Sequence, residues 1–149
     1  MARSTEVTVR EAELVESMKI WRFGRSHPEF AISERIRFYE KREVDEWIRN
    51  PEDNIVLIAE LGNGRLIGFL YCKLMSSHWA VIDNLLVDAK YRKRNVGSRL
   101  MRLCEKVLLG RRIEYVSLLA HSSDRVTHHF LEQRGYSPTS QLVWMEKFL

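Results

Sequence analysis

The chain has 149 residues, of which 45% are hydrophobic, which is enough for one domain with a sizeable core. Its apolar runs are too short to span a membrane, and residues 1–7 lack the apolar centre of a signal peptide. The net charge of +4 is compatible with nucleic acid, with another anionic ligand or with an acidic protein, so it does not distinguish these partners.

The N-terminal half has the patterns of a strand, two helices and a hairpin. In chain order these are a strand at 6–10, helices at 11–22 and about 33–49, and strands at 55–61 and 65–74. Ser33 is a suitable N-cap for the second helix. Gly62, Asn63 and Gly64 have the chemistry of the turn between the two later strands.

The C-terminal half continues to alternate between strand and helix patterns. We expect a strand at 81–87, a helix from about 96 to 110, a strand at 114–120, a helix at 124–134 and a final strand at 141–147. Gly110 and Gly135 are expected at helix C-termini, and Ser122 or Ser123 at the start of the last helix. The order is therefore β-α-α-β-β-β-α-β-α-β, in a single domain over 1–149.

The cysteines and histidines give no indication of a metal site. Cys72 and Cys104 lie far apart in apolar patterns, which predicts buried, reduced thiols in a cytoplasmic protein. His128 and His129 are neighbours on a predicted helix and point in different directions. We therefore expect no metal.

A short basic loop joins the strand at 81–87 to the following helix. The first turn of a helix has unpaired N–H groups and the positive end of the helix dipole, which together favour a phosphate. Gly97 permits close approach, and Asn95 tolerates a left-handed conformation. Positive charge around the turn comes from Arg92, Lys93, Arg94 and Arg99. We interpret the loop as a pyrophosphate-binding turn; the alternative is a solvated charged turn.

The loop resembles motif A of the GNAT family of N-acetyltransferases, which reads Arg/Gln-x-x-Gly-x-Gly/Ala. Here the sequence from Arg92 to Gly97 is RKRNVG, with Asn95 where the family usually has glycine. Residues 8–12, 66–69 and 129–136 resemble the family's opening strand, hairpin and late helix. The resemblance spans nearly the whole chain. It implies an α/β (α+β) fold in which helices flank a mixed, mostly antiparallel central sheet.

The resemblance also implies an activity, in which an acetyl group passes from acetyl-CoA to a primary amine of a small molecule or protein by direct attack. The backbone of Leu85, Leu86 and Val87 would bind the pantetheine arm of the cofactor. The pyrophosphate would lie at the basic turn, formed by Arg92, Lys93, Arg94, Asn95, Val96, Gly97 and Ser98. Asp124 stands where relatives place an asparagine that contacts the cofactor, and we expect it to cap the last helix.

The catalytic residues are less well defined by the sequence. Asp83 interrupts an apolar strand beside the expected thioester site, and a carboxylate taken out of water becomes a stronger base. The alternative role is a hydrogen-bonded strand or edge carboxylate. His121 is a second candidate, with a capping or surface histidine as its alternative. Many family members have a tyrosine in the late helix that acts as the general acid, and this position corresponds to Leu131. Another residue or solvent must therefore protonate the thiolate.

Aromatic residues are concentrated around the two early helices, where the family places its acceptor pocket. They are Trp21, Phe23, Phe30, Phe38, Tyr39 and Trp47. Ordinary packing of helices on a sheet explains the same residues. Two other functions remain open: a non-catalytic acyl-CoA-binding regulatory domain, and a nucleic-acid-binding module, which ranks last because the aromatics follow helix-core spacing. The apolar segment 142–149 could pair across a homodimer.

Overall fold

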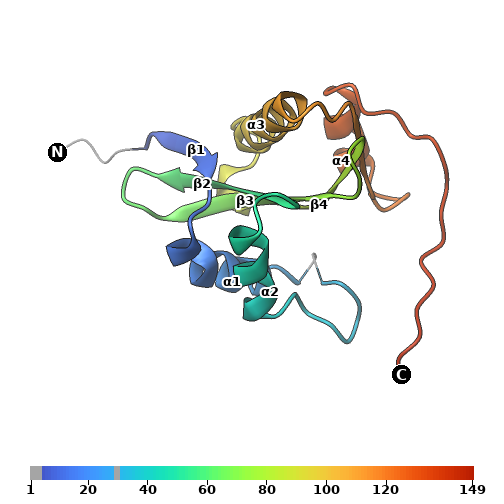
Figure 1. Cartoon of the computed structure of the whole chain (residues 1–149), viewed down its shortest axis with the longest axis horizontal. Coiled ribbons are helices and arrows are strands. Elements are labelled where there is room, and N and C mark those ends of the chain that lie inside the picture. Colours follow the sequence, from blue (N-terminus) through green and yellow to red (C-terminus); the bar gives the residue numbers. More distant parts are fainter. Residues whose placement is uncertain (1–4, 29–30) are drawn as a thin grey trace. The chain divides into compact units, whose positions relative to one another are not determined.

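The computed structural model describes residues 5–28 and 31–149 (Figure 1). The chain divides into two compact units, Met1–Leu118 and Leu119–Leu149. In the described part of the chain, no helix is long and apolar enough to cross a membrane.

The N-terminal unit is built on a five-stranded sheet in the order β1-β2-β3-β4-β5. The strands are β1 (Val7–Glu11), β2 (Asn54–Leu61), β3 (Leu66–Leu74), β4 (Trp79–Val87) and β5 (Tyr115–Leu118). The pairs β1–β2, β2–β3 and β3–β4 are antiparallel, whereas the pair β4–β5 is parallel. The predicted mixed, mostly antiparallel sheet is confirmed.

Helices cover both faces of this sheet. The helices α1 (Ser17–Arg25) and α2 (Lys41–Arg49) lie on one face, and α3 (Val96–Gly110) lies on the other (Figure 1). Short 3₁₀ helices, η1 (Leu14–Glu16) and η3 (Ala89–Tyr91), precede α1 and α3. Because β2 and β3 are covered on both faces, their central residues are almost continuously buried.

The core beneath α1 and α2 joins both helices to three strands. Its buried members are Ile20, Phe38, Val44, Trp47, Val56, Ile58, Phe69, Tyr71 and Leu86. On the α3 side, Cys72 and Cys104 are both free and buried, as expected. The hydrogen bond between the two thiols raises the pKa of Cys104, and burial raises it further. This thiol therefore stays neutral.

The start of the second helix differs from the prediction. Ser33 does accept backbone hydrogen bonds, from Arg35 at 3.2 Å and Ile36 at 3.1 Å, but these close a local turn. Helix α2 begins only at Lys41, where Glu40 and Glu43 form a reciprocal capping box. The first helix also begins later than expected, because 3₁₀ geometry precedes Ser17.

The C-terminal unit contains α4 (Arg125–Glu132). Its N-cap is Asp124, not Ser122 or Ser123, because the Asp124 carboxylate accepts the Thr127 N–H at 3.0 Å. Gly135 adopts a left-handed φ of 86° after the helix, as expected. Gly110, in contrast, is the last residue of α3, and Arg111 is the C-cap.

The final strand expected at 141–147 is not formed in the structure, where residues 135–149 have no helix or strand. Its apolar side chains are exposed: Leu142, Val143, Trp144 and Met145. An apolar segment forms a strand only where a neighbouring strand supplies hydrogen bonds, and none pairs with this segment in the described residues.

Gly68 on β3 allows a test of the close packing between β3 and β4. A Cβ atom at this position would lie 2.8 Å from the backbone oxygen of Leu86, which cannot move without disturbing β4. We expect Gly68→Ala to lower the free energy of unfolding by about 1–3 kcal/mol, as overpacking does. Chemical denaturation measures this change.

Gly110→Ala is the matched control, because a Cβ atom there meets nothing within 4 Å. It lies in α3, where alanine is the better helix former, so stability should hold or rise by up to about 1 kcal/mol. Equal effects of the two substitutions would contradict the close approach of Gly68 to β4.

Candidate active site

Strand β4 continues beyond its pairing with β5. The parallel register runs from Trp79↔Tyr115 to Ile82↔Leu118 and stops there. From Leu85 to Val87 the strand pairs only with β3 in the described N-terminal unit. The β5 side of this segment therefore has the backbone groups to which an extended ligand can add as a further strand.

A β-bulge lies at the point where this pairing ends. Tyr71 on β3 is opposite Asn84, and the next residue, Cys72, is opposite Ile82. Asp83 is thus the extra residue of β4, and bulges of this kind redirect side chains. The expectation that Asp83 is buried was wrong, because Asp83 is exposed.

The Asp83 carboxylate has two hydrogen-bond donors on the same oxygen. The hydroxyl of Tyr39 donates to Oδ2, and the side-chain amide of Asn84 donates to Oδ2 at 3.0 Å. Burial raises the pKa of Tyr39, and so does its hydrogen bond to Asp83. Tyr39 therefore stays protonated at neutral pH and remains a donor to the carboxylate.

Aromatic rings pack around Tyr39, the donor of this hydrogen-bonded pair. The Trp47 and Tyr71 rings stack with centroids 3.8 Å apart and an interplanar angle of 9°, and Tyr39 meets Trp47 edge-on at 4.8 Å. Burial, and then the charge of Asp83, raise the pKa of Tyr71, whose hydroxyl donates to Asn54 at 2.8 Å.

Most of the aromatic residues singled out in the sequence pack in or against the core. Phe38 and Trp47 are buried members of the core, and Trp21, Phe23 and Tyr39 pack against it. Phe30 lies outside the described residues. Packing therefore accounts for the described members, and Tyr39 additionally reaches Asp83.

The loop before α3 has the backbone geometry expected of an anion-binding turn. Asn95 is the N-cap of α3 with a left-handed φ of 62°, so asparagine supplies the conformation for which the family usually has glycine. Lys93 is also left-handed, with φ 60°. The Arg92 guanidinium donates to the Val87 carbonyl at 3.0 Å, which ties the loop to the end of β4.

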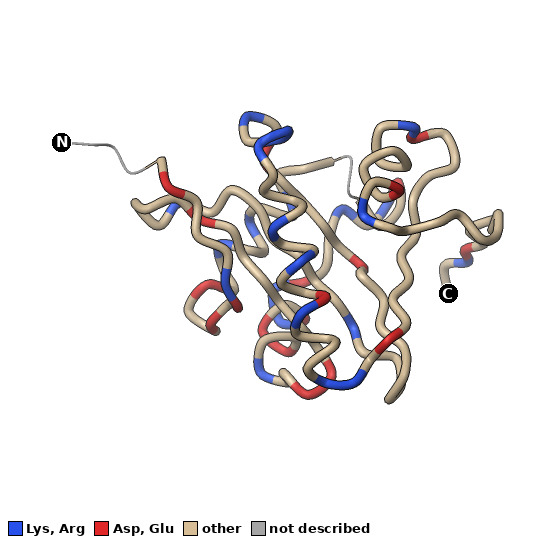
Figure 2. Tube along the Cα trace, turned by 90° about the horizontal axis from the view of Figure 1, so that it is seen from above, with Lys and Arg blue, Asp and Glu red and all other residues tan. Residues whose placement is uncertain are grey.

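Positive charge continues from this loop along α3 (Figure 2). The basic residues are Lys90, Arg92, Lys93, Arg94, Arg99, Arg102 and Lys106. Val96 and Ser98, in the first turn of α3, are each only 2% exposed.

The remaining predicted site residues belong to the C-terminal unit. Asp124 caps α4, as the sequence suggested, and its hydrogen bonds from Thr127 lower its pKa. His121 is exposed, and its carbonyl is hydrogen-bonded to the His128 ring at 2.9 Å. No group of three His, Cys, Asp or Glu among the described residues is placed to hold a metal ion.

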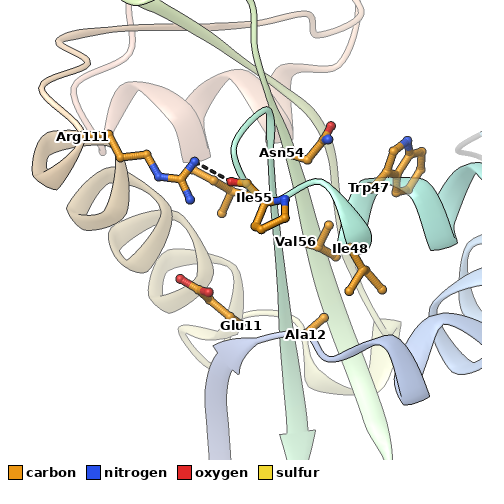
Figure 3. Close-up of a pocket in the computed structure, with 9 residues that line it drawn as sticks. Glu11, Ala12, Trp47, Ile48, Asn54, Ile55, Val56 and Arg111 are labelled. Carbon is orange, nitrogen blue, oxygen red and sulfur yellow. Dashed lines mark hydrogen bonds between the residues drawn. The ribbon is translucent and has the colours of Figure 1, made fainter.

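A separate small cavity lies at another part of the N-terminal unit (Figure 3). Its lining includes Glu11, Trp47 and Val56, and the Arg111 guanidinium donates to the Pro51 carbonyl there at 2.7 Å. At about 30 Å³ the cavity holds one water molecule, so it does not suit a substrate.

Residues 17–136 match the Acetyltransferase (GNAT) family. No significant match is found among curated protein sequences. The match covers most of the chain, including β4, the loop and α3, and the chain therefore belongs to the GNAT family.

Solved structures of acetyltransferases have the same fold. An aminoglycoside acetyltransferase from an uncultured soil metagenomic sample, in complex with sisomicin, has a TM-score of 0.77 at 17% identity over 96% of each chain. PaiA N-acetyltransferase from Thermoplasma acidophilum, in complex with coenzyme A, has a TM-score of 0.67 at 18% identity, over 87% of this chain and 88% of its own.

A third structure, AAC(6')-Iy with the bisubstrate analog CoA-S-monomethyl-acetylneamine, has a TM-score of 0.77 at 12% identity, over 97% of this chain and 99% of its own. At these identities the likeness concerns the fold.

The left-handed Asn95 gives a test of the loop geometry. We expect Asn95→Val to lower the free energy of unfolding by about 1–2 kcal/mol, since a β-branched residue is strained at this φ. Asn95→Gly removes the same side chain and should fold at least as stably. Denaturant unfolding compares the two variants, and equal loss in both would contradict a conformational role.

Proposed function

We propose that this protein transfers an acetyl group from acetyl-CoA to a primary amine of a small molecule or a protein. The observation that carries the proposal is one continuous path along β4, the basic loop and α3. Beyond Ile82 the strand has a side without a β5 partner in the described N-terminal unit, and it leads directly to the left-handed loop at Asn95. Family membership supports the same activity.

The cofactor follows this path. The pantetheine arm lies along the backbone of Leu85, Leu86 and Val87, as an added strand would. The pyrophosphate accepts hydrogen bonds from backbone N–H groups between Lys93 and Ser98, at the positive end of the α3 dipole. The relative solved with coenzyme A has the same fold, which supports this cofactor.

The ammonium group of the acceptor must lose a proton before its nitrogen can attack, and Asp83 accepts this proton. The amine nitrogen then bonds to the thioester carbon and loses its second proton to solvent as the carbon–sulfur bond breaks, and the thiolate of coenzyme A takes up a proton. A backbone N–H at the end of β4 stabilises the negative carbonyl oxygen. Leu131 cannot donate the final proton, so solvent supplies it.

The acceptor side of the site is acidic. Glu40 and Glu43 form the capping box of α2, next in sequence to Tyr39, and the charge of Glu43 contributes to the raised pKa of Tyr39. A cationic amine is favoured beside these carboxylates. The relatives solved with sisomicin and with an acetylneamine analog are consistent with such an acceptor.

The Asp83→Asn variant tests the proposed base. We expect kcat to fall by about 10²–10⁴-fold, because the amide cannot accept the ammonium proton, while affinity for acetyl-CoA is unchanged. Release of coenzyme A measures turnover, and calorimetry measures affinity. Asp53→Asn is the matched control, since this exposed turn residue precedes β2.

Unchanged turnover in Asp83→Asn would remove Asp83 from the mechanism. Acetyl-CoA binding without turnover in the native protein, over a panel of amines, would instead support the non-catalytic acyl-CoA-binding alternative.

Gly97→Leu tests the proposed pyrophosphate site. Gly97 is in the first turn of α3, where a bulky side chain would occupy the space of the phosphates. We expect the Kd for acetyl-CoA to rise at least about tenfold, which calorimetry measures. Gly110→Leu, at the other end of the same helix, should bind normally, and normal binding by Gly97→Leu would refute the assignment.

A further inference from the structure

We infer that Tyr39 is a positioning residue that holds the Asp83 carboxylate in its working orientation. The inference rests on the proposed function, in which Asp83 is the base. The two residues come from distant parts of the chain: Tyr39 precedes α2, whereas Asp83 is the bulge residue of β4. Their hydrogen bond joins the helical layer to the strand at the point where the β5 ladder ends.

The hydrogen bonds fix the rotation of the carboxylate. Tyr39 and Asn84 both donate to Oδ2, which leaves Oδ1 to take the proton of the amine. A bulge residue on an open part of a strand lacks the packing that normally restricts a side chain, and Asp83 is exposed. The Tyr39 hydroxyl therefore supplies order that the strand itself does not.

Tyr39 is suited to this role because its own position is well determined. Its carbonyl accepts a hydrogen bond from the Trp21 indole at 3.1 Å. Its ring meets Trp47 edge-on at 4.8 Å and Phe38 edge-on at 5.5 Å. Contacts with three aromatic residues thus hold a tyrosine that lies outside any helix or strand.

Phe38 in turn is fixed by a close approach to α1. A Cβ atom added to Gly24 would lie 2.2 Å from Cζ of Phe38, so the ring occupies space that only glycine leaves open. Phe38 is 7% exposed and also contacts Phe69 on β3, with ring centroids 6.2 Å apart. Because Phe38 adjoins Tyr39 and its ring contacts the Tyr39 ring, this packing restricts the position of Tyr39.

The protonation state of Tyr39 matches the role. Burial first, then the hydrogen bond and charge of Asp83, and then the charges of Tyr71 and Glu43 raise its pKa. The phenol therefore remains a hydrogen-bond donor throughout the neutral range, and in this inference Tyr39 acts through Asp83.

Tyr39→Phe removes this hydroxyl and keeps the ring. With acetyl-CoA and sisomicin as substrates, we expect kcat to fall about 10–100-fold, the usual effect of losing a supporting hydrogen bond, while the KM for acetyl-CoA is unchanged. Tyr115→Phe is the matched control, because Tyr115 pairs with Trp79 at the opposite end of the β4–β5 ladder from Asp83. It should leave kcat unchanged.

The double variant Tyr39→Phe/Asp83→Asn separates positioning from a general structural effect. If Tyr39 acts through Asp83, the double variant is no slower than Asp83→Asn alone. Full kcat in Tyr39→Phe, together with a slow Asp83→Asn, would overturn the role of Tyr39 and leave the proposed function intact. Full activity in Asp83→Asn would overturn the roles of both residues and leave the acetyl transfer itself intact.

Denaturant unfolding of the same variants tests the contact without any acceptor. The stability losses of Tyr39→Phe and Asp83→Asn should be non-additive in the double variant, whereas those of Tyr115→Phe and Asp83→Asn should add. Additive losses for Tyr39 and Asp83 would overturn the inference whatever the acceptor.

Discussion

The backbone hydrogen bonds between β4 and β5 reach only as far as Ile82, while β4 itself continues to Val87. A strand in the middle of a sheet normally has both edges paired, so an interrupted ladder exposes peptide groups beside a hydrophobic core. In this protein the interruption coincides with the bulge at Asp83 and is followed directly by the loop into α3. One irregularity of the sheet thus places an acidic side chain beside a strand segment without a β5 partner in the described N-terminal unit and leads to a helix N-terminus, and this is the path that we propose for the cofactor.

The two ends of this path have different electrostatic character. The loop and α3 carry a succession of basic residues, and the helix dipole adds to their positive potential. Near Asp83, in contrast, the capping box of α2 places Glu40 and Glu43 beside Tyr39. An anionic cofactor and a cationic acceptor would each be attracted to the matching end.

Sequence patterns predicted well those parts of the fold that depend on local chemistry. The apolar runs of β2 and β3 were placed almost correctly because strands covered on both faces need continuous burial. The left-handed conformation of Asn95 was also predicted, since few other side chains tolerate it.

The parts that sequence reasoning missed depend on contacts between distant residues. Ser33 had the chemistry of an N-cap, but Glu40 and Glu43 begin the helix, and the two signals are locally equivalent. Asp83 was expected to be buried because its neighbours are apolar, and no pattern indicates a bulge that depends on the register with β3. Tyr39 was treated as one of several packing aromatics, since nothing local marks its contact with Asp83.

Calorimetric titration of the protein with acetyl-CoA, compared with desulfo-CoA and with ATP, tests the central claim most directly. The account predicts that acetyl-CoA and desulfo-CoA bind much more tightly than ATP, because the proposed site on the β5 side of β4, beyond Ile82, holds the pantetheine arm that ATP lacks. Equal binding of ATP would mean that the basic loop alone attracts phosphates. Absence of acetyl-CoA binding would contradict the account.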